Sequence, residues 1–230
     1  MGRWLTVLVV VACAGCAKHN VTVLFFSANG YSFSDQERMA IQDVADSSVS
    51  DIRHLLPMLP RDLMLRVQPG SHVVAETGEN GYSTQPNSIG WLVDPRHPGG
   101  VAATVHRELR GTLFHEFHHL VRYAAVGTPR SLMDDVIAEG MATAFERDGA
   151  GTSPQWGQYP ADVAGWVTEL LSLPPDADAS YWLDTRHADG RRWIGMRAGT
   201  YLVDRAMRAS GQSFAQLVST PTETVIRMSR

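Results

Sequence analysis

The segment HEFHH, at His115 to His119, constrains the fold of this 230-residue chain more than any other feature. It lies in an apolar stretch, GTLFHEFHHLVRYAAV, which we interpret as a helix. Residues four apart on a helix lie on one face, so the imidazoles of His115 and His119 are expected one turn apart. This is the HExxH arrangement of a zinc site, in which Glu116 acts as general base on the attacking water. The alternative is a surface helix that happens to be rich in histidine.

A catalytic zinc ion needs a third protein ligand besides the two histidines. One known extension of the motif, HExxHxxGxxH, requires a glycine three residues and a histidine six residues after the second histidine. Those two positions hold Arg122 and Ala125, which excludes this extension. The other known solution takes a Glu from a second helix, about 20 or more residues further along the chain.

A second helix with a suitable carboxylate follows the first. Residues 127–129, Gly-Thr-Pro, end the first helix, and Ser131 with Asp134 forms a capping signal for the next. Glu139 lies in the middle of this second helix among small and apolar residues, where a carboxylate is costly to bury unless it binds a metal or a partner. We therefore predict Glu139 as the third ligand. Gly140, which weakens a helix, is expected to serve close packing.

Three other acids on the second helix remain rivals for the same role. They are Asp134, Asp135 and Glu146. Glu139 could also be a half-exposed residue without a metal, as most glutamates on helices are.

The two helices together resemble a known protein family. The pattern HExHH, followed by a helix with EG-[LM]-A, is similar to a bacterial family of predicted zinc-dependent proteases, formerly described as a domain of unknown function. The resemblance runs from SIGWLVD, which begins at Ser88, to near the C-terminus, and includes HHLVR, AEGMATAFE and RWIGMRAGTYLV. It implies an α+β, zincin-like fold: a small N-terminal mixed sheet with helices, an active-site helix carrying HExxH, and a mostly helical C-terminal part. It also implies a gluzincin-type site with one catalytic Zn²⁺, His115, His119 and Glu139 as ligands, and Glu116 as base.

The donor that stabilises a developing oxyanion is the first point where this chain departs from the family. The family often carries a Tyr at about the position of Met196. Tyr201 is our first candidate for the missing donor, and Arg197 or His187 is the second choice. The alternative for Tyr201 is an ordinary packing residue.

The partner of a metal-bound histidine is the second departure. A ligand histidine normally donates its other N–H to a carboxylate or carbonyl. Gluzincins often place an acid one turn after the ligand Glu, where this chain has Thr143. Asp135, one turn before Glu139, could substitute. His118 points about 100° away from His119 on the helix, so we expect it to pack or to face solvent.

The first 20 residues, MGRWLTVLVVVACAGCAKHN, are typical of an export signal. Their apolar run is too short for a transmembrane anchor. Cys13 and Cys16 are the two cysteines of the chain, and each follows a small residue, as a lipoprotein cleavage site requires. We predict residues 1–16 as a lipoprotein-type signal with a lipid anchor on Cys16, or else on Cys13. Ordinary cleavage near Ala14 or Ala17 stays open, and in every case a disulfide is not expected.

The remaining residues, 17–230, have the length of a single domain. The formal net charge of -4 and the lack of basic clusters argue against a nucleic-acid partner. The oligomeric state is left open by the sequence.

The N-terminal part reads as a βαβ unit, and a helix-rich part follows it. The expected elements are a strand at 21–26, a helix capped by Ser34 and Glu37, a strand at 63–67, a loop at 78–87, a strand at 88–94, an active helix beginning near Ala103 or Thr104, and later helices at 163–171, 197–210 and 213–218. In zincins a strand at the sheet edge borders the cleft and can pair with a peptide substrate. We predict Ile89 to Val93 as that strand, with a plain core strand as the alternative.

These observations favour an exported, lipid-anchored zinc metallopeptidase that acts on peptides or proteins and contacts the membrane only through its anchor. One rival is a zinc hydrolase of a non-peptide amide or ester. The other is a non-catalytic envelope lipoprotein. The intact Glu116 argues against the second rival, because a purely structural zinc site fills its fourth position with a protein ligand and needs no base.

Overall fold

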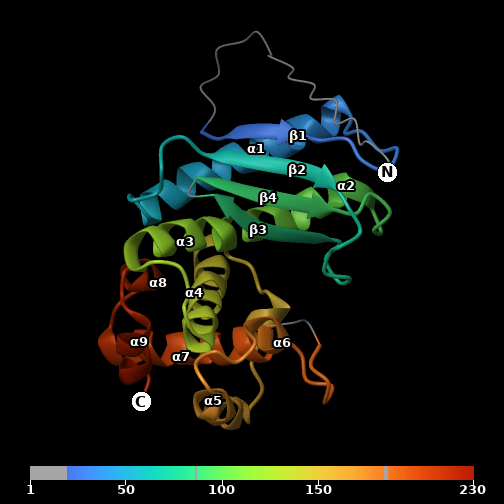
Figure 1. Ribbon diagram of the computed structural model, residues 1–230. Helices are drawn as coiled ribbons and strands as arrows, with labels where there is room; N and C mark the ends of the chain where they lie inside the picture. Colours follow the sequence, from blue (N-terminus) through green and yellow to red (C-terminus); the bar gives the residue numbers. More distant parts are fainter. Residues whose placement is uncertain (1–19, 86, 184–185) are drawn as a thin grey trace. The chain divides into compact units, whose positions relative to one another are not determined.

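The fold places a small mixed sheet before a series of helices, as a computed structural model shows for residues 20–85, 87–183 and 186–230 (Figure 1). This is the expected α+β, zincin-like arrangement. The expected export signal, with Cys13 and Cys16, lies outside the described residues and stays a prediction. The described residues divide into two compact units, 20–117 and 118–230.

The first unit contains four strands in the order β1-β2-β4-β3. The strands are β1 (Thr22–Phe25), β2 (Met64–Pro69), β3 (Glu79–Gln85) and β4 (Ser88–Val93). β1 and β4 run parallel to β2, whereas β3 pairs antiparallel with β4. The predicted βαβ unit is therefore confirmed.

Helix α1 (Asp35–Leu55) is the crossover of this unit and begins at the predicted capping box. The Ser34 hydroxyl accepts from the Glu37 backbone N–H, while the Glu37 side chain accepts from the Ser34 backbone. The buried residues of α1 recur at helical spacing and form one stripe that is apolar except for Ser48: Ile41, Ala45, Ser48, Val49 and Ile52.

The position of the edge strand corrects two expectations. Residues 78–87 were expected as a loop, but most of them form β3. Ile89 to Val93, expected at the edge, belong to β4, which lies between β2 and β3 and is almost fully buried. The edge next to β4 is therefore formed by β3, and β4 is a core strand.

The helical run that contains the active helix begins earlier than expected. The run comprises α2 (Gly100–Thr104), a π-helical segment (Val105–Leu109) and α3 (Arg110–Val126). It starts after Gly99, whose φ of 87° is a left-handed conformation that suits glycine. The start was expected near Ala103 or Thr104, and no Ser, Thr, Asp or Asn precedes Gly100 to mark the earlier boundary.

The second unit is helical among its described residues. Its elements are the C-terminal part of α3, α4 (Leu132–Ala150), the short 3₁₀ helix η2 (Gln155–Gly157), α5 (Val163–Ser172), α6 (Ala179–Leu183), α7 (Ile194–Ser210), α8 (Phe214–Leu217) and α9 (Thr222–Met228). Ser131 accepts from the Asp134 backbone N–H, which confirms the predicted cap of α4. Among the described residues, no helix combines the length and apolar character that crossing a membrane requires.

Helices α4 and α7 touch through a pair of glycines. A Cβ built on Gly140 would overlap the backbone of Gly199 and Thr200, and a Cβ on Gly199 would overlap the carbonyl of Val136. Backbone atoms cannot move aside as the end of a flexible side chain can. The close packing predicted for Gly140 is confirmed, and it fixes the segment of α4 that carries Glu139.

Replacing Gly140 by Ala is therefore expected to destabilise the protein, although Ala is the better helix former. The propensity gain of about 1 kcal/mol is smaller than the cost of separating the two backbones, about 1–3 kcal/mol. Gly165 on α5 is the matched control, because nothing lies within 4 Å of a Cβ there. Gly165→Ala should raise the free energy of unfolding in a urea titration, whereas Gly140→Ala should lower it. A stabilised Gly140→Ala would contradict the close contact.

Candidate metal centre

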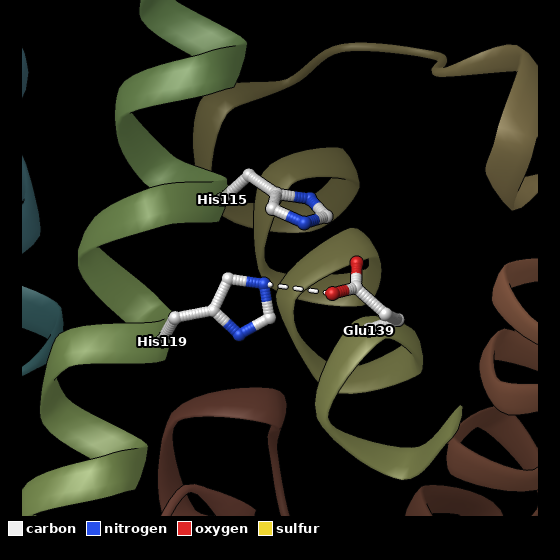
Figure 2. A group of neighbouring side chains, drawn as sticks. All are labelled: His115, His119 and Glu139. Atoms are coloured by element: carbon white, nitrogen blue, oxygen red, sulfur yellow. Dashed lines mark ion pairs between the residues drawn. The ribbon is translucent and has the colours of Figure 1, made fainter. Parts of the chain in front are cut away.

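Helix α3 places His115 and His119 one turn apart on the same face, as the spacing predicts (Figure 2). Both are buried, with relative exposures of 7% and 4%. The boundary between the two units falls inside this helix, after Phe117. His118 is fully buried and packs against Phe145 at a centroid distance of 5.5 Å, so it is a packing residue. The alternative of a histidine-rich surface helix is thus wrong.

Glu139 is the acid that α4 brings to the two histidines. Figure 2 shows both imidazoles projecting from α3 toward the Glu139 carboxylate. The His119 Nε2 and Glu139 Oε1 atoms are 3.4 Å apart. One ligand atom from each of His115, His119 and Glu139 lies within 4.8 Å of the others.

This donor set fits a zinc ion. Two imidazole nitrogens and one carboxylate oxygen form a known catalytic zinc set, which leaves a fourth position for water. Two ligand atoms bound tetrahedrally to one zinc at 2.0–2.1 Å are about 3.3 Å apart. The observed 3.4 Å between His119 and Glu139 is close to that separation.

The rival acids on α4 have other contacts. Asp134 accepts from the Ser131 hydroxyl and the Arg130 backbone at the helix cap. Glu146 is 4% exposed, and its carboxylate accepts from Trp156 Nε1.

Asp135 lies in the electrostatic field of the three-residue group. Burial raises the pKa of Asp135 to about 6, and repulsion from Glu139 and Asp134 adds to this, whereas His119 opposes it. This interaction agrees with an outer role for Asp135 beside His119, which stays a prediction. Thr143, the residue at the usual outer position, is fully buried on the same helix.

Glu116, the predicted base, is fixed within the first unit by the edge strand. It is 7% exposed and its Oε2 accepts from the Ser83 hydroxyl of β3 at 3.1 Å. The contribution of Ser83 was missed, because residues 78–87 have the composition of a loop and carry no signal that pairs them with α3.

The candidate oxyanion donors lie on or just before α7. The Tyr201 ring packs edge-on against Tyr159 at 5.3 Å, and the Arg205 guanidinium lies 5.7 Å from its centroid. Arg197 donates to the Gln155 carbonyl, while burial and the nearby Arg192 charge lower its pKa. His187, half-buried, stacks on Trp182 at 4.8 Å. These contacts of Tyr201 are those of a packing residue, and its role as oxyanion donor stays a prediction.

The fold and the three-residue group define an HExxH-type metalloprotein with a Glu on a second helix. The chain belongs to a family described as "Predicted Zn-dependent protease (DUF2268)", whose model matches residues 39–227. Zinc is thus the cofactor that both the family and the donor set indicate. Among curated proteins, none matches the chain.

Proposed function

We propose that this protein is a zinc metallopeptidase that hydrolyses peptide bonds with His115, His119 and Glu139 as ligands and Glu116 as general base. The observation that carries the proposal is the convergence of the three ligand side chains, which lie within 4.8 Å of one another, with Glu116 next to His115 on α3. The family description supports a protease at a coarser level.

The chemistry of this chain centres on Glu116. When bound, zinc would supply a Lewis acid that lowers the pKa of water and polarises the scissile carbonyl. Glu116 accepts one proton from the attacking water and passes it to the leaving amine. A C–O bond forms and the C–N bond breaks, so one water is consumed and the products are a carboxylic acid and an amine.

We also propose that the substrate lies along β3 as an added strand. An edge strand offers unpaired backbone N–H and C=O groups to an extended peptide. β3 is at the end of the strand order and carries Ser83, which contacts Glu116. A peptide paired with this strand would be held near the base.

The test combines metal analysis with cleavage of a peptide library. We expect one zinc ion per chain, cleavage that stops when a chelator removes the metal, and recovery when zinc is restored. Absence of bound zinc would contradict the whole proposal. Bound zinc without cleavage of any peptide would favour a non-peptide amide or ester substrate, or a non-catalytic site.

A further inference from the structure

Three alternate residues of β3 face the active helix α3. Successive side chains of a strand alternate between its faces, so Glu79, Gly81 and Ser83 share one face. Each of them contacts Thr112 or Glu116, which lie one turn apart on α3. We name this set of contacts the β3–α3 seam.

Glu79 anchors one end of the seam. Glu79 is 3% exposed, and its Oε2 accepts from Trp91 Nε1 and from the Thr112 hydroxyl, both at 2.8 Å. Trp91 is fully buried in β4. A buried carboxylate that accepts two good hydrogen bonds is expensive to move, so Glu79 fixes the strand, the helix and the indole relative to one another.

Gly81 gives Glu116 room beside the strand. A Cβ at Gly81 would overlap the Thr112 methyl group and lie 2.8 Å from the Glu116 Cγ. The φ of Gly81 is not left-handed, so this glycine is required by packing rather than by backbone conformation. The strand can therefore approach the Glu116 side chain closely enough for the next residue on the same face to reach its carboxylate.

We propose that Ser83 is a positioning residue for the general base, which makes this inference dependent on the proposed function. The Ser83 hydroxyl donates to Glu116 Oε2 at 3.1 Å. This bond restrains the terminal torsion of the Glu116 side chain, which rotates the carboxylate. A terminal torsion of this kind is broad and poorly fixed by packing alone. By holding Oε2, Ser83 sets the orientation in which the carboxylate accepts the proton from water.

The experiment compares Ser83→Ala with wild type in zinc content, unfolding and steady-state kinetics on a cleaved peptide. We expect one zinc per chain, a KM within about twofold of wild type, and a kcat lower by about 10- to 100-fold, because a hydrogen bond to a charged group is lost. Ser47→Ala, the same change at an exposed position of α1, should leave both kinetic constants unchanged.

The isosteric pair Ser83→Thr and Ser83→Val tests the role of the hydroxyl even if Ser83→Ala folds poorly. Thr keeps the hydroxyl and Val lacks it, so only Thr should restore kcat. Equal kcat for the two variants, or a raised KM with an unchanged kcat, would overturn the positioning role. A wild-type protein that cleaves no peptide would overturn the proposed function instead, and this inference with it.

Discussion

Glu116→Gln is expected to lower kcat for peptide cleavage by about 100- to 10,000-fold while one zinc ion stays bound per chain. The amide has nearly the same shape as the carboxylate and still offers an oxygen to the Ser83 hydroxyl, so the β3–α3 seam should persist. An amide cannot take up a proton near neutral pH, and therefore the loss should appear in kcat rather than in folding. The measurements are zinc content and steady-state kinetics on the same preparation.

Glu223→Gln on α9 is the control for this prediction, because it removes one acidic charge from an exposed position. It should change neither zinc content nor kcat. Wild-type kcat in the Glu116→Gln variant would mean that another group accepts the proton. Loss of zinc from that variant would mean that Glu116 binds the metal or stabilises the fold. The role of general base would then have to be abandoned.

The metal-binding face could be predicted from the sequence because it depends on local rules. A spacing of four residues places His115 and His119 on one face of a helix in any surroundings. The capping signal at Ser131 sets where α4 begins, and Glu139 is then in its interior. The remaining step, that α4 lies with Glu139 toward the histidines, rested on the cost of burying a carboxylate and on the family resemblance.

The edge strand β3 could not be predicted, because its residues suit contacts with α3 and do not have a high strand propensity. Gly81 leaves space for the side chains of Thr112 and Glu116, and Ser83 donates a hydrogen bond to the Glu116 carboxylate. Glycine and serine both weaken the appearance of a strand in sequence. The stability of β3 comes from its pairing with β4 and from the buried Glu79, neither of which is visible along the chain.

The start of α7 could not be predicted from the sequence either. The helix was expected at residue 197 and begins at Ile194. Its N-cap is Trp193, a non-glycine residue at φ 50°, which makes no side-chain capping bond. No capping residue marks this boundary, and the left-handed tryptophan is held by packing against Trp156 and the neighbouring guanidinium groups.

Glu139→Ala is expected to weaken zinc binding by about 100- to 1,000-fold, since the roughly 10–16 kcal/mol of a four-ligand site amounts to a few kcal/mol per ligand. The variant keeps the helix, because Ala is the best helix former, and it removes the oxygen that lies 3.4 Å from His119 Nε2. Competition with a chromophoric chelator measures the zinc Kd directly. Unfolding in urea with and without zinc checks that the apo fold survives.

The Asp135→Asn variant tests whether Glu139 or Asp135 is the third zinc ligand. If Asp135 acts only on the electrostatics around His119 and Glu139, its loss should raise the zinc Kd by about 10- to 100-fold at most, the range for residues outside the ligand set. Glu139→Ala should therefore have the larger effect. An unchanged Kd for Glu139→Ala, together with a strong loss in Asp135→Asn, would assign the third ligand to Asp135. The side chain one turn earlier on α4 would then bind the metal, and Glu139 would be the residue that tunes it.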